Sequence, residues 1–454
     1  MASEGDPTAL ESWLDGLDED SIRDLLEEAT LRVAGLADWL ETRRAAASDD
    51  PAELLTIVNR DLTPRRRFYD YWQANRYASD AYDAVELLRT QSANATPALV
   101  PVIERAITLS TRAILKSDDS SGAQGDLVRR LLEAHAQAVR AASPALSQAE
   151  QTRVVKWIIK YRYSGAQDFF DPDIVAYAPG LSEKSITQYR TAIASTDLGE
   201  YGTYPLTRLA VLDRDRDAIV AAHGGEPKNA QLARRLVADL EEAGLHDDAV
   251  AYARIGIALD GQGWNQQLVT FVVDDALLRG AESEAIDVRR AWFARFPLAS
   301  AFTALRETAE QVGEWQTEKA DAEALLAQHS PQSFAQHLLD EDRNGEAWEF
   351  AVSRFAVDGA HATWLNLCQR RATTAPADTL PVYREIVQQT LEVTDKRNYR
   401  TAANVLKTMR DAAVAAGPDG ERSFEAFLAQ VVDQNRRRPT CIEAFRKAKL
   451  IPRV

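Results

Sequence analysis

Histidine and cysteine are the residues of this chain whose spacing says most about possible chemistry. Two zinc ligands on one helix face require pairs such as His-x3-His or His-Glu-x2-His, and none of the six histidines forms such a pair. His361 and Cys368 would share a helix face, but two ligands do not complete a metal site. The spacing therefore predicts no metal site and no cofactor.

Other catalytic patterns are missing as well. The serine-hydrolase pattern Gly-x-Ser-x-Gly and the phosphate-binding pattern Gly-x4-Gly-Lys-Ser/Thr do not occur. Neighbouring acids such as Asp274-Asp275 and Asp340-Glu341-Asp342 point to different sides of a helix, which favours solvated faces or helix ends over catalytic pairs. We therefore predict that the protein is not an enzyme. A site assembled from residues far apart in the sequence stays open, because sequential distance does not measure spatial distance.

A run of arginine and aromatic residues favours binding over catalysis. One stripe of a predicted helix contains Arg65, Tyr69, Trp72 and Arg76. Arginine beside an aromatic plane is a common way to bind nucleic-acid bases or an acidic partner. In the alternative interpretation the aromatic rings pack into the core while the arginines stay in solvent.

A second basic face is predicted on the helix over residues 148–163, where lysines accompany Trp157 and Tyr161. Basic side chains near a helix C-terminus also complement the helix dipole, so the pattern does not by itself require a ligand. The candidate partner-binding residues are Arg65, Arg66, Arg67, Tyr69, Trp72, Arg76, Lys156 and Lys160.

The composition restricts the class of protein. The chain has 454 residues, 45% of them hydrophobic, which predicts a folded protein too long for one compact core. The formal net charge of −16 disfavours non-specific binding to nucleic acid or an anionic membrane. Two cysteines suit a reducing compartment, and neither a secretory signal nor a membrane-spanning apolar run is visible. Together with the excess of arginine over lysine, these features predict a protein of the bacterial cytoplasm.

The elements that must position any site are helical hairpins. Turn residues recur at Gly244, Gly280 and Gly313, with Asn344-Gly345 in the fourth place, at intervals of 36, 33 and about 31 residues. A period in this range is typical of a helical solenoid. Asp18-Glu19-Asp20 and Asp50-Pro51 predict helix starts nearer the N-terminus, because acids cap free amides and proline suits the first helical position.

The middle of the chain resembles the tetratricopeptide repeat. Ala249 and Ala285 each follow a turn glycine by five residues, and Pro297 ends the helix of the second repeat. The third repeat has Glu318 where alanine is expected, and in the fourth Ala347 is out of register with its turn. The β-branched segment 269–273 would pass for a strand in isolation, but we predict it to be helical because no partner strand is available.

These patterns predict an all-α fold, a helical-hairpin repeat array or α-solenoid that is tetratricopeptide-like in the middle. We predict three parts: an N-terminal helical bundle or array over 1–198, tetratricopeptide-like hairpins over 199–358, and a C-terminal helical cap over 359–454.

A second resemblance covers much of the chain. A leucine-rich opening over 17–31, a segment over 168–194 and an ending with Arg436-Arg437-Arg438 before a short basic helix are similar to the helical regions of bacterial proteins that carry a SWIM zinc finger. The finger itself is absent, because Cys368 and Cys441 cannot supply its ligands. The resemblance implies a role in interactions, with an ATPase of the AAA class or a SWIM-finger protein as partner.

The functional prediction is a non-catalytic scaffold that binds another protein along one face of the array. The alternative is a nucleic-acid-associated regulatory protein that uses the basic-aromatic stripe.

Overall fold

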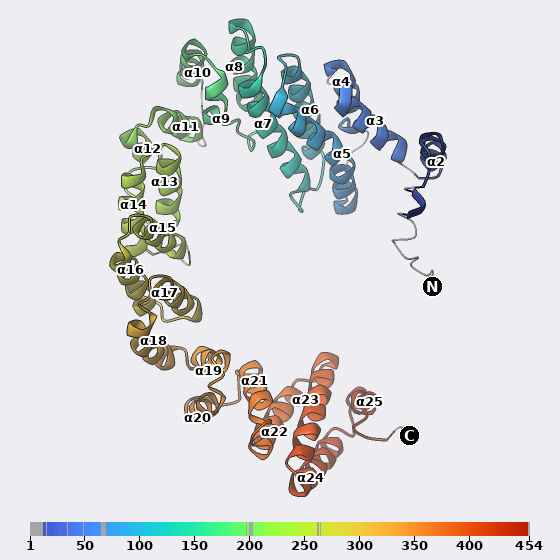
Figure 1. The fold of residues 1–454 in the computed structure, drawn as a ribbon, viewed down its shortest axis with the longest axis vertical. Helices are drawn as coiled ribbons and strands as arrows, with labels where there is room; N and C mark the ends of the chain where they lie inside the picture. The colour runs from blue at the N-terminus through green and yellow to red at the C-terminus, as the bar shows by residue number, and fades with distance from the viewer. Residues whose placement is uncertain are drawn as a thin grey trace. The chain divides into compact units, whose positions relative to one another are not determined.

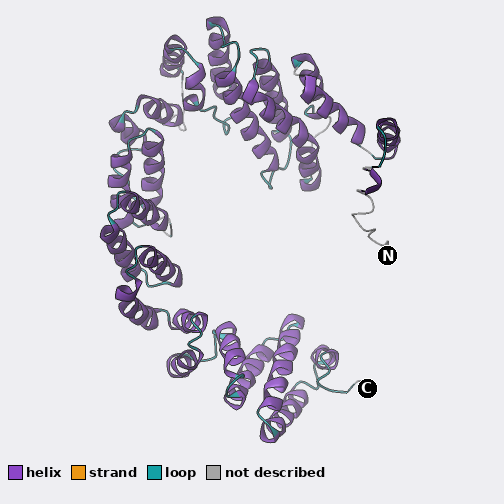
Figure 2. Ribbon diagram, viewed as in Figure 1, coloured by secondary structure: helices purple, strands orange, loops and turns teal. Residues whose placement is uncertain are grey.

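The computed structural model describes residues 12–14, 16–33, 35–48, 50–64, 70–196, 198, 203–260, 263 and 265–452. The described residues form helices and no strand, so the predicted all-α helical repeat array is confirmed (Figure 2). Segment 269–273 is helical, as expected, inside α15 (Asn265–Leu278). None of the described helices is both long enough and apolar enough to cross a membrane.

The chain divides into two compact units, Met1–Gly261 and Gln262–Val454. The boundary falls inside the tetratricopeptide-like region, and the three-part division from the sequence stays a prediction. The first unit contains the following helices (Figure 1): α2 (Glu19–Arg32), α3 (Leu36–Ser48), α4 (Pro51–Asp61), α5 (Tyr71–Gln91), η1 (Ser92–Asn94), α6 (Leu99–Ile114), α7 (Ala123–Ala141), α8 (Gln148–Tyr163), α9 (Ile174–Tyr177), η2 (Ala178–Gly180), α10 (Glu183–Ser195), α11 (Thr203–Asp213), α12 (Arg216–Ala222), α13 (Ala230–Glu242) and α14 (His246–Ala258).

In the second unit, each helix up to α24 (Pro418–Gln434) contacts the next one in the sequence, and the last helix, α25 (Pro439–Lys447), contacts α23 (Lys396–Ala415). In addition, α19 (Pro331–Asp340) contacts α21 (His361–Arg371). Contacts between alternate helices are what stacked hairpins produce. The unit contains α15, α16 (Glu282–Arg295), α17 (Ala299–Gln311), α18 (Trp315–His329), α19 (Pro331–Asp340), α20 (Asn344–Arg354), α21 (His361–Arg371), α22 (Pro376–Glu392), α23 (Lys396–Ala415), α24 (Pro418–Gln434) and α25 (Pro439–Lys447).

Helix starts follow the local sequence. The carboxylate of Asp18 accepts a hydrogen bond from the amide of Ser21, and that of Asp50 accepts one from the amide of Ala52. Pro51 takes the first helical position of α4. These acids satisfy amides that have no partner inside the helix, and both predicted starts are confirmed.

One hydrogen-bonded turn ends the first helix of five hairpins in succession. The turn residues adopt positive φ and recur every 29 to 36 residues. At Gly244, the amide of the glycine donates a hydrogen bond to the carbonyl of Glu241. The amide of Leu245 donates a second one to the carbonyl of Leu240. This is the Schellman arrangement, which favours glycine because it has no Cβ. The five turn residues are Arg214, Gly244, Gly280, Gly313 and Asp342.

The sequence prediction of the fourth turn is wrong. The residue with positive φ is Asp342, whereas Asn344 and Gly345 already belong to the first turn of α20. Ala347 therefore follows its turn residue by five positions, as Ala249 follows Gly244, so its predicted loss of register is also wrong. Both alanines are completely buried, which lets the two helices of a hairpin approach closely.

Glu318 replaces the small residue in the third hairpin without leaving a buried charge. Its carboxylate accepts hydrogen bonds from Nε and Nη2 of Arg290 on α16, at 2.9 and 2.7 Å. A paired guanidinium offsets the cost of partly burying the carboxylate.

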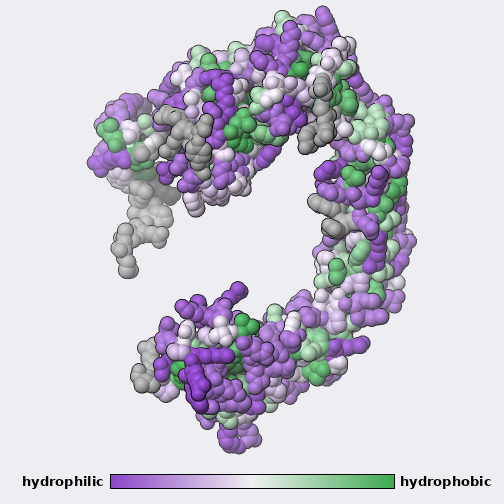
Figure 3. Space-filling view, turned by 180° about the vertical axis from the view of Figure 1, so that it is seen from behind, coloured by the Kyte–Doolittle hydropathy of each residue, from purple (hydrophilic) through white to green (hydrophobic). Residues whose placement is uncertain are grey.

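The core of each unit is apolar. Ile103, Leu131 and Ile158 are fully buried in the first unit, and Phe293 and Tyr383 in the second. The face in Figure 3 carries hydrophilic residues around smaller hydrophobic areas. Burial of these side chains is the main stabilising contribution to both units.

One polar cluster lies inside the first unit around His135 of α7. Its Nδ1 lies 2.8 Å from the hydroxyl of Tyr177, and its Nε2 lies 3.3 Å from a carboxylate oxygen of Glu104 without an aligned hydrogen bond. The other oxygen of Glu104 accepts a hydrogen bond from Arg153. The ring also packs against Trp157 at 4.4 Å. Burial lowers the pKa of His135 despite the nearby carboxylate, so the imidazole is neutral at neutral pH.

This histidine makes the stability of the protein depend on pH. The unfolded chain takes up a proton near pH 6.5 that the folded chain resists, so the free energy of unfolding falls as pH drops below that value. His135→Gln keeps hydrogen-bonding groups and removes the titration. We expect denaturation between pH 7 and 5 to show a weaker pH dependence in the variant, by up to about 1.4 kcal/mol per pH unit. Equal slopes would contradict this origin.

Candidate functional site

A groove in the second unit is lined mainly by α17 and α19, with one residue each from α21 and α18. α17, α19 and α21 are the first helices of three successive hairpins. The cavity volume of the groove is about 600 Å³, within the range of ligand-binding pockets. We refer to it as the α17–α21 groove. Its lining includes Phe302, Thr303 and Glu307 from α17, Ser333, His337 and Asp340 from α19, and Thr363 from α21.

The polar side of α17 lines the groove, because the apolar side of this helix packs into the core. Leu305 and Ala309 are buried, whereas Thr303, Glu307 and Glu310 are exposed at helical spacing along the groove. Apolar surface of the same cavity comes from the exposed Ala299, while Phe302 and Leu326 border it with 4% and 1% of their surface exposed. The groove thus combines an apolar lining with hydroxyl and carboxylate groups.

The carboxylates of the groove differ in their partners. Glu310 is paired with Arg306, whose Nε donates to it at 2.7 Å. Asp340 accepts a hydrogen bond from Gln336 and forms no ion pair with the described residues. Glu307 has neither an ion pair nor a hydrogen bond to the part of the chain that the structure describes. It does interact with Arg289 through its charge: burial lowers the pKa of Arg289, and the negative charge of Glu307 partly counteracts that lowering.

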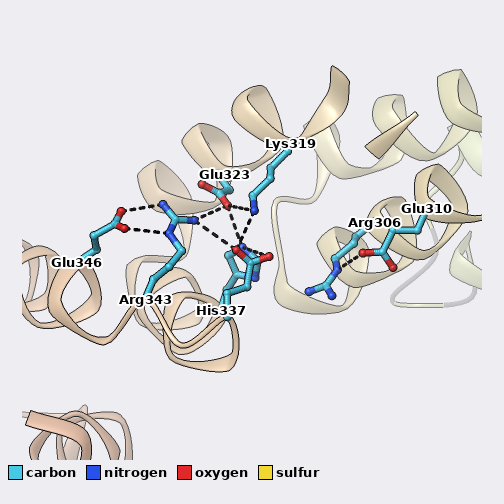
Figure 4. A network of polar contacts seen from close by, with 8 residues as sticks. Arg306, Glu310, Lys319, Glu323, His337, Arg343 and Glu346 are labelled. Atoms are coloured by element: carbon cyan, nitrogen blue, oxygen red, sulfur yellow. Dashed lines mark hydrogen bonds and ion pairs between the residues drawn. The ribbon is translucent and has the colours of Figure 1, made fainter. Parts of the chain in front are cut away.

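Behind the groove an ion-pair network joins α18, α19 and α20 (Figure 4). His337 Nε2 lies 3.1 Å from Glu323 and 3.9 Å from Glu341. Lys319 contacts Glu341 at 2.8 Å, and Arg343 contacts Glu323 at 2.8 Å. Burial raises the pKa of Glu341, but the hydrogen bond from Lys319 and nearby positive charges outweigh it, so the net shift is downward.

The same network contains one cluster with metal-ligand chemistry. Ligand atoms of Glu323, His337 and Glu341 lie within 4.8 Å of one another. Lys319 and Arg343 already contact both carboxylates, so a divalent cation would have to displace two positive charges. This donor set fits an ion-pair network better than a metal centre.

His337 connects the network to the groove. Its ring contacts Phe302 edge-to-face with centroids 4.8 Å apart, while its Nε2 faces Glu323. The side chain is almost fully buried, at 7% exposure. His337 thereby links α19 to α18 through Glu323 and to α17 through Phe302.

The arginine stripe predicted from the sequence is only partly visible. Arg65, Arg66, Arg67 and Tyr69 lie outside the described residues. Trp72 is 76% exposed and Tyr71 is exposed beside it, so the interpretation in which these rings pack inward is wrong for both. α5 starts at Tyr71, and Asp70 caps it by accepting from the amide of Trp72, which leaves both rings on the first turn.

Arg76 lies in an acidic environment. It lines a cavity of about 620 Å³ in the first unit together with Arg60 and four acids, Asp38, Asp61, Asp80 and Asp83. The cavity lining also includes Thr63 and Gln73. The negative charges of four aspartates beside Arg76 disfavour binding of a nucleic-acid phosphate backbone at this residue.

Lys156 and Lys160 are exposed on α8, but the neighbouring rings are engaged elsewhere. Trp157 stacks on Tyr161 with centroids 5.1 Å apart and also packs on His135. The hydroxyl of Tyr161 lies 2.8 Å from that of Thr111. The lysines and the aromatic rings therefore do not form one open surface.

A comparison of the sequence with models of known protein families finds no match, and a search of curated proteins finds none. The functional argument therefore depends on the fold and the groove.

Proposed function

We propose that this protein is a non-catalytic helical repeat scaffold that binds a segment of another protein in the α17–α21 groove. The observation that carries the proposal is the position of the cavity on equivalent helices of three successive hairpins. Repeat proteins use such continuous surfaces to bind extended partners. The resemblance to SWIM-associated helical regions supports an ATPase of the AAA class or a SWIM-finger protein as partner, in the bacterial cytoplasm.

The nucleic-acid alternative has less support. Trp72 offers an open aromatic ring, but Arg76, the described arginine of the predicted stripe, lines a cavity that holds four aspartates and one other arginine, Arg60. A net charge of −16 also repels a phosphate backbone.

Photocrosslinking tests the proposal. The photoreactive residue p-benzoylphenylalanine replaces Thr303 or Gln332 in the groove, and in control proteins it replaces Asp321 or Glu349, exposed residues of the second helices α18 and α20. We expect ultraviolet light to attach a polypeptide to the groove variants in the native host and not to the controls. The adduct should resist nuclease and disappear with protease. Equal labelling of groove and control positions, or no protein adduct, would overturn the proposal.

A further inference from the structure

We infer that the α17–α21 groove selects an extended polypeptide segment that carries arginine or lysine side chains. This inference rests on the proposed function and adds the chemistry of the bound segment. It follows from the charges, the hydrogen-bonding groups and the apolar surface that the groove presents.

The charges of the groove favour a cationic ligand. Its lining contains three carboxylates, Glu307, Glu310 and Asp340, against one guanidinium, Arg306. Arg306 is engaged by Glu310 at 2.7 Å. Glu307 and Asp340 form no ion pair with the described residues and are both exposed, so each can pair with a basic side chain of a partner.

The uncharged groups of the groove suit a polypeptide. Thr303, Ser333 and Gln332 line it with hydroxyl and amide groups, which can satisfy the amides and carbonyls of an extended backbone. The exposed methyl group of Ala299 adds apolar surface for a small or aliphatic side chain between the basic ones. A chain in extended conformation points alternate side chains to opposite sides, so basic and apolar residues can reach different walls.

Matched peptides test the chemistry. Three fluorescein-labelled peptides share an alanine–serine background and carry arginine, glutamine or glutamate at the same positions. We expect the arginine peptide to bind the full chain most tightly in fluorescence anisotropy, and its affinity to fall with added salt. Glu307→Lys combined with Asp340→Lys should raise its Kd about tenfold, since each exposed ion pair contributes up to about fivefold.

The control reverses two charges outside the groove. Asp321→Lys with Glu349→Lys makes the same change in net charge on exposed positions of α18 and α20, and should leave the Kd within about twofold. If both double variants weaken binding equally, or if the glutamine or glutamate peptide binds as tightly as the arginine peptide, the inferred chemistry is wrong. A protein adduct at Thr303 with no preference for the arginine peptide would overturn this inference alone, whereas loss of the adduct would overturn the proposed function.

Discussion

Arg208→Ala is expected to destabilise the first unit by about 3 kcal/mol, because it leaves a group of carboxylates without their shared cation. The guanidinium of Arg208 on α11 is buried, with 7% of its side chain exposed. It donates two hydrogen bonds of 2.8 Å to Asp173 and others to Asp239 and Glu242. Burial disfavours its charge, but the hydrogen bonds that it donates to Glu242 and Asp173 outweigh this and raise the pKa of Arg208 above its ordinary value.

Chemical denaturation of the full chain measures this effect. Arg208→Lys keeps the charge but loses the fork geometry, so we expect an intermediate loss of stability. Arg129→Ala is the matched control: its side chain is 58% exposed and pairs with Asp126, one turn away, so its loss should stay below about 0.5 kcal/mol. A similar result for Arg208→Ala and Arg129→Ala would show that the buried network contributes little.

Gly180→Ala is expected to cost about 2 to 3 kcal/mol through overpacking alone. Gly180 ends η2 and packs on the end of α7. A Cβ there would lie 2.4 Å from the carbonyl oxygen of Val139 and 2.8 Å from the Cα of Arg140. These are backbone atoms, so no side-chain rotation relieves the contact.

Gly345→Ala makes the same chemical change where nothing lies within 4 Å of the added Cβ. Its stability should stay within about 0.5 kcal/mol of the parent protein, since alanine also suits a helix better than glycine. Thermal melting of both variants compares the two sites directly. An equal loss in both would mean that close packing at Gly180 is not the cause.

The helical fold could be predicted because its signals are local. Glycine at Gly244, Gly280 and Gly313 marks turns, since only glycine takes positive φ without strain. Arg214 and Asp342 adopt the same conformation at a cost of roughly 1 kcal/mol, which packing of the hairpins offsets. Arginine does not indicate such a turn, and aspartate indicates it less strongly than the nearby glycine of Asn344-Gly345. The turn at Arg214 was therefore not predicted, and the turn at Asp342 was placed at Asn344-Gly345.

The groove could not be predicted because its lining comes from three hairpins. The acids Asp340-Glu341-Asp342 show what the sequence conceals. Asp340 lines the groove, Glu341 pairs with Lys319, and Asp342 forms the turn. Three adjacent residues of similar chemistry thus have three different roles, which depend on the helices packed around them.

The repeated turn has a consequence for how such a chain can change in length. Because the same hydrogen-bonded turn joins the two helices of each of these five hairpins, and each helix contacts mainly its neighbours, adding or deleting one whole hairpin among them preserves the interface on either side. Inserting a single residue within a helix instead rotates all later side chains by about 100° and turns buried alanines such as Ala249 towards solvent. Natural variation in length among relatives should therefore occur in whole hairpins. A hairpin added beside α21 would extend the α17–α21 groove without any change to the helices that line it now.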